Sequence, residues 1–168
     1  MNKRGHVINA VLLSLGVGYI LEPRLSPALL VAIAKVSPPI VLGALFPDLD
    51  TAFGQHRKTF HNVWVLGLAL AFPYFFENLQ FVWIGITTHY VLDLLGNIKG
   101  MGILYPLPGF YDIPVGVNIN SKWADVVTLL VTAFELVILA TLAILGHQAQ
   151  FATPQFPQTI EQALSLVA

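Results

Sequence analysis

The chain has 168 residues, of which 56% are hydrophobic and only 10% are charged, and its mean hydropathy is +0.74. This composition argues against a soluble globular protein, and 8 basic against 9 acidic residues provide neither a basic surface for nucleic acid nor an acidic tail. There is no cysteine, which excludes disulfides, thiolate zinc sites and cysteine nucleophiles. Any metal must therefore be held by His, Asp or Glu, a donor set that suits zinc or manganese.

Five apolar segments follow one another along the chain, at 7–21, 28–46, 63–76, 79–95 and 126–145. We interpret all five as helices, because open strands cannot satisfy their backbone groups in lipid. The sequence thus predicts an all-α integral membrane bundle, one domain over residues 1–146, with a polar, proline-containing tail over 147–168. A very apolar soluble bundle is the alternative, which the last and cleanest segment disfavours.

The first two segments each raise a question of their own. Two basic residues before the first segment resemble the start of a secretory signal, but no small-x-small cleavage site precedes Glu22, and cleavage would remove His6. We therefore expect an uncleaved first helix. The second segment is expected to be broken at Pro38 and Pro39. Several segments are shorter than the roughly 20 residues that span a bilayer, so the first and third are expected to tilt little, thin the bilayer or lie partly in its interface.

The basic residues predict how the chain is oriented. With the N-terminus inside, only Arg24 lies near the membrane on the outer side, whereas the inner side receives Lys3, Arg4, Arg57, Lys58, Lys99 and Lys122. This positive-inside bias predicts a multi-pass protein of the plasma (inner) membrane with a cytoplasmic N-terminus.

Residues that can bind metal lie at the helix ends that this topology brings to the cytoplasmic face. They are His6 at the first helix, Asp48 and Asp50 after the second, His61 before the third, and His89 and Asp93 in the last turns of the fourth. Lys and Arg alone define the orientation, so this convergence is independent of it. We predict a metal site built from these six residues.

The spacing of the candidate ligands has alternative explanations. His89 and Asp93 form an i,i+4 pair on one helix face and can offer a nitrogen and an oxygen to one ion, although the same spacing suits a simple hydrogen bond. Ionisable residues inside a membrane segment are costly and functional by default, which favours the ligand role. Asp48 and Asp50 could alone be a polar turn, but beside His61 we favour ligands. Which carboxylate binds directly stays open, and the other would orient a ligating histidine.

Neighbouring residues have open roles. His56 could bind metal, shuttle a proton or simply lie in the loop. Arg57 and Lys58 could clamp a phosphate beside the metal or anchor the chain to anionic headgroups. His6 taken alone would more often be an interfacial histidine. His147 falls on the opposite side, and we expect no role for it.

Two further features lie outside this cluster. Lys35 and Glu135 fall well inside the second and fifth segments, and we expect a buried ion pair between those helices, with a proton or ion path as the alternative. The long stretch 96–123 is rich in Gly and Pro with aromatic residues between them, too irregular for a helix. Loops of this length are usually functional or disordered. Its apolar residues favour a segment that folds over the site or dips into the interface.

Three stretches, GALFPDLD (43–50), HRKTFHN (56–62) and HYVLDLLGNIKGMGILYPLPG (89–109), resemble the YdjM (DUF457) family of membrane-bound, metal-dependent hydrolases. The similarity covers roughly residues 5 to 110, with the motifs in the family's order. Phe60 stands where Thr is usual and Asn62 where Ser is usual, changes that would alter hydrogen bonds behind the ligands rather than remove a ligand. The resemblance implies a membrane helical fold and metal-dependent hydrolysis.

The order of the ligands is also similar, more distantly, to that of zinc-dependent phospholipases C and P1-type nucleases, helical enzymes that cleave phosphoesters. By that likeness Asp48, His61, His89 and Asp93 would hold one ion, and His6 with Asp93 a second. The later His/His/Glu set that completes a third site in those enzymes has no counterpart here. The likeness implies one or two ions, zinc first and manganese second.

We therefore expect a membrane-bound hydrolase in which metal-activated water attacks a phosphoester, most plausibly that of a lipid. Asp50 or His56 would act as general base, and Arg57 or Lys58 would hold the anionic group. Membrane lipids are expected partners and nucleic acid is not. A non-catalytic membrane protein that uses the ion for structure, sensing or partner docking is the alternative. A small transporter ranks last, because the His and Asp residues gather at one end rather than near the bilayer midplane.

Overall fold

The computed structural model describes residues 3–76, 79–95, 100–113, 117–118 and 121–152, with the backbone alone over 147–152. Its long helices are α1 (Lys3–Leu21), α2 (Pro27–Leu45), α4 (Val63–Phe75), α5 (Val82–Leu95) and α6 (Ala124–Ala152). A 3-10 turn, η1 (Pro47–Leu49), and the one-turn α3 (Asp50–Phe53) lie between α2 and α4. Over these residues there is no strand, only an isolated bridge between Met101 and Tyr111. The all-α prediction is confirmed for this part of the chain.

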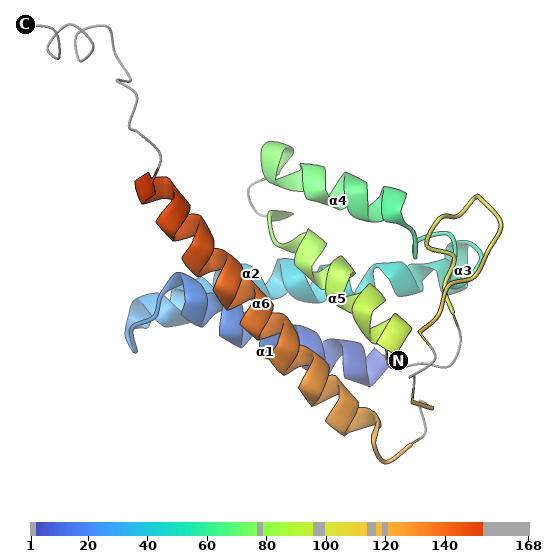
Figure 1. The fold of residues 1–168 in the computed structure, drawn as a ribbon, viewed down its shortest axis with the longest axis horizontal. Helices are drawn as coiled ribbons and strands as arrows, with labels where there is room; N and C mark the ends of the chain where they lie inside the picture. The colour runs from blue at the N-terminus through green and yellow to red at the C-terminus, as the bar shows by residue number, and fades with distance from the viewer. Residues whose placement is uncertain (1–2, 77–78, 96–99, 114–116, 119–120, 153–168) are drawn as a thin grey trace, which may run out of the picture.

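The long helices pack side by side in the order α6, α1, α2, α5 and α4. α1 lies against α2 and α6, while α5 lies between α2 and α4 (Figure 1). One buried apolar cluster, which includes Leu13, Ile40 and Ile84, joins α1, α2 and α5. α2 and α5 approach most closely at Gly43 and Gly85, where an added Cβ would collide with the backbone of the other helix. Small residues at such crossings are typical of helices that associate in membranes.

The described helices include three that are long and apolar enough to cross a membrane. These are the segments Lys3–Leu21, Pro27–Phe53 and Ala124–Gly146, whereas α4 and α5 are apolar but shorter. Many large apolar side chains are exposed, and polar ones such as Asn9 are buried. Exposed apolar surface of this extent marks contact with a membrane or with partner proteins.

The helix bounds correct three predictions. α1 begins at Lys3 rather than at residue 7, which gives it 19 residues, so it is not too short to span. α2 continues through Pro38 and Pro39, so the predicted break is wrong. Burial of Val36, Pro39 and Ile40 against neighbouring helices outweighs the local cost of two prolines. α6 continues beyond residue 146 to Ala152, and the rest of the predicted tail lies outside the described residues.

The expected ion pair between Lys35 and Glu135 is also wrong over the described residues. The Glu135 carboxyl instead forms hydrogen bonds with Asn9 and Thr88, and Lys35 is exposed on α2. Hydropathy predicted a similar depth in the membrane for both charged residues, but it does not predict the side of its helix on which each side chain lies.

Candidate metal centre

The predicted ligands come together at one end of the molecule, where the start of α1, the short α3 and the end of α5 meet (Figure 1). Five of the six side chains are almost completely buried: His6 1%, Asp50 0%, His61 0%, His89 0% and Asp93 2% exposed. The Asp48 side chain is 16% exposed and that of His56 is 44% exposed, so these two form the open edge of the cluster. Buried groups of this kind must be paired or must bind a cation.

The tautomers of His61 and His89 are determined by their hydrogen-bond partners. Nδ1 of His89 lies 2.6 Å from the carbonyl oxygen of Ala44, and Nδ1 of His61 lies 2.8 Å from Oδ2 of Asp50. Both partners are acceptors, so each Nδ1 carries the hydrogen and each Nε2 presents a lone pair. The two Nε2 atoms nevertheless face each other at 3.0 Å.

Two facing lone pairs require either a shared proton or a cation between them. Burial lowers the pKa of His61 below its usual range, although the adjacent Asp50 carboxylate acts in the opposite direction. The neutral ring is therefore favoured, which leaves no proton to share. Neutral imidazole nitrogens are the preferred histidine ligands of divalent metals.

Carboxylates complete a set of donors around this nitrogen pair. Oδ2 of Asp93 lies 3.6 Å from Nε2 of His61 and 3.8 Å from Nε2 of His89, and Oδ1 of Asp48 lies 3.8 Å from Nε2 of His89. Zinc bonds of about 2.0–2.1 Å place neighbouring tetrahedral ligands roughly 3.3 Å apart. The mutual spacings of His61, His89 and Asp93, 3.0, 3.6 and 3.8 Å, lie near that value, so these three donors fit one ion, with Asp48 beside His89.

His6 offers a further donor. Its ring stacks on that of His89 with centroids 3.8 Å apart, and its Nε2 lies 3.3 Å from Oδ1 of Asp93. Neither ring nitrogen of His6 makes a hydrogen bond within the described part of the chain, although both are buried. One donor atom each from His6, His89 and Asp93 lie within 4.8 Å of one another. A buried imidazole with no well-aligned hydrogen bond, and with a carboxylate beside its Nε2, is suited to a metal.

Asp50 stands behind the histidines rather than among the donors. Its Oδ2 binds Nδ1 of His61 and its Oδ1 binds Nδ1 of His56, both at 2.8 Å. A carboxylate that fixes the tautomer of a ligating histidine is a common outer partner of metal sites. The geometry therefore favours Asp48 over Asp50 as the direct ligand, a choice that the sequence left open.

Arg57 joins the site from its loop. Nη2 of Arg57 lies 3.3 Å from Oδ2 of Asp93, and its side chain is only 11% exposed. Its backbone has a φ of 66°, a left-handed conformation that non-glycine residues rarely adopt. The described part of the long loop packs on this segment, since the N–H of Gly102 donates to the carbonyl of Arg57 at 2.7 Å.

Several residues support the site without offering a metal donor. Asn62 caps α4 by accepting from the N–H groups of Trp64 and Val65, and thereby fixes His61 just before the helix. Its place before an apolar run is a recognisable cap signal. The Tyr90 hydroxyl donates to the carbonyl of Phe60 at 2.6 Å. No sequence signal identifies the Ala44 carbonyl, because backbone partners depend on how helices cross.

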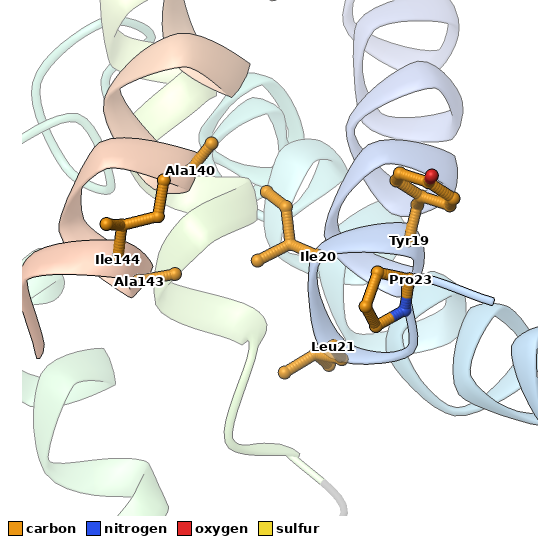
Figure 2. A pocket seen from close by; sticks show the side chains of 7 residues that line it. All are labelled: Tyr19, Ile20, Leu21, Pro23, Ala140, Ala143 and Ile144. Carbon is orange, nitrogen blue, oxygen red and sulfur yellow. The ribbon is translucent and has the colours of Figure 1, made fainter. Parts of the chain in front are cut away.

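The site is distinct from the pocket at the other end of the molecule. Figure 2 shows that pocket, about 720 Å³ in volume, between the end of α1 and α6. Its described lining residues are apolar apart from the hydroxyl of Tyr19, and none of them is His, Asp or Glu.

Comparisons with known proteins add no assignment. No protein-family model matches this chain, and no curated protein or solved structure matches it. The resemblance to the YdjM family therefore stays a prediction that rests on the motifs alone.

Proposed function

We propose that this protein is a membrane-bound hydrolase that binds zinc, or alternatively manganese, at the His/Asp cluster and cleaves a phosphoester. The observation that carries the proposal is the pair of buried Nε2 lone pairs of His61 and His89, 3.0 Å apart and flanked by carboxylates. Such an arrangement is unfavourable without a cation. When bound, the ion supplies a water of lowered pKa and a Lewis acid for a phosphoryl oxygen.

The residues of the cluster are assigned separate roles in binding the ion and the substrate. His61, His89, Asp93 and Asp48 would hold the ion, with His6 next to Asp93 available for a second. Arg57 neutralises part of the carboxylate charge through Asp93. We assign it to the substrate's anionic group, with the half-buried Lys58 as its neighbour.

His56 is the best-placed general base. Both oxygens of Asp50 are already occupied by His56 and His61 at 2.8 Å, which leaves Asp50 as the orienting carboxylate. Its hydrogen bond to Nδ1 of His56 leaves the Nε2 of that exposed ring able to accept a proton at the open edge. The Asp50–His56 pair thus resembles the acid–histidine pairs that orient other general bases.

A lipid substrate is favoured by an apolar groove beside the site. The groove, of about 330 Å³, lies between α2, α4 and α5 and is lined by apolar side chains, among them Leu42, Leu49 and Phe72. Leu49 is the last residue of η1 and lies between Asp48 and Asp50 in the chain. A lipid with an acyl chain in the groove would therefore bring its headgroup to the metal donors. We therefore favour a phospholipid-like ester at the cytoplasmic face of the plasma membrane, with the N-terminus on that side.

The first test is the metal content of the detergent-purified protein by elemental analysis. We expect stoichiometric zinc or manganese in the wild type and its loss in His89→Ala and Asp93→Ala, because each variant removes a donor. His147→Ala and Asp125→Ala are matched controls that should retain metal, and circular dichroism checks that all variants are helical. A wild type without metal, even after divalent ions are added back, would remove the hydrolase mechanism.

The second candidate is a metal site that serves structure alone. It is favoured by the burial of His6, His61 and His89, which are only 0–1% exposed, because closed sites are typical of structural zinc. A chelator would then unfold the protein, and the loaded protein would hydrolyse no phosphoester. Retained helicity after chelation, together with cleavage of a phosphoester upon reloading, would support the hydrolase.

A further inference from the structure

A second polar cluster lies between α1, α5 and α6, separate from the metal donors, with Glu135 half-buried at its edge. It consists of Asn9 on α1, Thr88 on α5, and Thr132 and Glu135 on α6, and we refer to it as the Glu135 cluster. Asn9, Thr88 and Thr132 are 0%, 2% and 3% exposed. The proposed hydrolysis uses none of them.

Five short contacts connect this cluster. The Asn9 amide nitrogen lies 2.9 Å from Oγ1 of Thr132 and 2.8 Å from Oε2 of Glu135. Oγ1 of Thr88 lies 2.6 Å from Oδ1 of Asn9 and 2.7 Å from Oε1 of Glu135. The Thr132 hydroxyl also lies 2.7 Å from the carbonyl oxygen of Thr128.

The hydrogens available for these contacts are one too few if Glu135 is ionised. The Asn9 amide supplies two hydrogens, and the Thr88 and Thr132 hydroxyls one each, which makes four for five contacts. Thr88 in particular has a single hydrogen but faces two acceptors, Asn9 and Glu135. One of its contacts would then bring two oxygens together without a hydrogen.

Exchanging the amide oxygen and nitrogen of Asn9 does not remove the deficit. The choice between them rests on the hydrogen-bond network. In the exchanged arrangement Asn9 donates to Thr88, but its oxygen then faces Oε2 of Glu135 at 2.8 Å. It also faces Oγ1 of Thr132, whose hydrogen is directed to the Thr128 carbonyl, so two contacts lack a hydrogen and a neutral Glu135 could supply only one of them. The first arrangement, completed by one hydrogen from Glu135, is therefore the one that satisfies all five contacts.

We propose that Glu135 is a neutral carboxylic acid in the folded protein, and that its donated hydrogen bond makes it a positioning residue for the metal centre. In the first arrangement Oε1–H of Glu135 donates to Thr88, Thr88 donates to Asn9, and all five contacts are satisfied. A neutral acid also avoids the cost of an unpaired charge within an apolar helix bundle. The positioning role rests on the proposed metal centre, whereas the protonation state does not.

The cluster is placed to position two of the donors. Asn9 follows His6 by three residues, so both project from one face of α1. Thr88 precedes His89 directly on α5. Glu135, on α6, contacts Asn9 of α1 and Thr88 of α5. Removing the hydrogen bond that Glu135 donates would therefore loosen the position of His6 relative to His89.

Infrared difference spectroscopy at neutral pH tests the protonation state. Subtracting the spectrum of Glu135→Gln from that of the wild type should reveal the carbonyl stretch of a protonated carboxyl, shifted in ²H₂O. Glu22→Gln is the matched control, because Glu22 pairs with Arg24 at 3.2 Å and should contribute only carboxylate bands. If the Glu135 difference shows carboxylate bands instead, the proposal is wrong whatever the metal centre does.

Zinc titration against a competing chelator tests the positioning role. Glu135→Gln retains a donor toward Thr88 and an acceptor toward Asn9, so its zinc affinity should equal that of the wild type. Glu135→Ala should bind zinc about tenfold more weakly, at the low end of the effects of outer-sphere substitutions. Equal weakening in both variants, or in neither, would overturn the positioning role. A wild type that binds no zinc would instead count against the proposed function and leave the infrared result standing.

Discussion

At the scale of single residues, Asp50 orients two histidines of the centre and is not itself a proposed metal ligand. Both of its oxygens accept hydrogen bonds from histidines, one from the buried His61 and one from the exposed His56. The carboxylate therefore holds the His61 ring with its Nε2 lone pair toward Nε2 of His89, and the His56 ring with its Nε2 lone pair toward the open edge. An amide in its place could accept from only one of them and would donate to the other.

Asp50→Asn is expected to lower zinc affinity about 10- to 100-fold, because an amide favours the wrong tautomer of one histidine. The measurement is a zinc titration with a competing chelator on the detergent-purified protein. Asp125→Asn is the control, since Asp125 forms only an exposed ion pair with Arg4 at 3.6 Å. If Asp50→Asn binds zinc as the wild type does, the orienting role of Asp50 is wrong.

At the scale of helices, the centre depends on how closely α2 approaches α5. Ala44 on α2 accepts from His89 on α5, and this contact exists only because Gly43 and Gly85 let the two backbones meet. A Cβ added at Gly85 would collide with the carbonyl oxygen of Ile40 and the backbone nitrogen of Ala44. Separating the helices would move the His89 ring away from Asp48.

Gly85→Ala should therefore destabilise the protein by about 1–3 kcal/mol, as overpacking does, and should weaken zinc binding as well. Gly67→Ala on α4 is the matched control, because a Cβ at Gly67 meets no atom within 4 Å. The control should be neutral or more stable by up to about 1 kcal/mol, owing to higher helix propensity. Thermal unfolding in detergent measures both, and similar stabilities for the two variants would contradict the close crossing.

The helices themselves were largely predictable, because a segment such as 126–145 has few ways other than a helix to satisfy its backbone in lipid. The gathering of His6, His61 and His89 at one end also followed from helix direction alone. Features that depend on the rotation or crossing of helices were not predictable. One example is the contact of Glu135 with Asn9 and Thr88 in place of Lys35. Another is that Asp50 contacts His56 and His61, whereas Asp48 lies beside His89. Both depend on helix packing that no short sequence pattern reveals.

At the scale of the whole molecule, helix direction determines which ends lie beside the centre, and the basic residues carry the proposed orientation. α1, α4 and α6 run away from the metal centre, and α2 and α5 return to it. Lys3 and Arg4 lie at the end of α1 that carries His6, while Arg24 lies just beyond the opposite end of α1. The positive-inside rule is the basis of our proposal that the centre faces the cytoplasm, in which case any lipid cleaved there would come from the inner leaflet.

The absence of native cysteines makes this orientation directly testable by labelling single introduced cysteines. Leu25, 92% exposed between α1 and α2, and Gln55, exposed beside the metal centre, lie at opposite ends of α2. Leu25→Cys should react with a membrane-impermeant maleimide in intact cells, and Gln55→Cys only in inverted vesicles. The reverse pattern would place the centre outside and remove the inner leaflet as its source of substrate. Labelling of both positions from one side would mean that α2 does not cross the membrane, so the exposed apolar surfaces would need another cover.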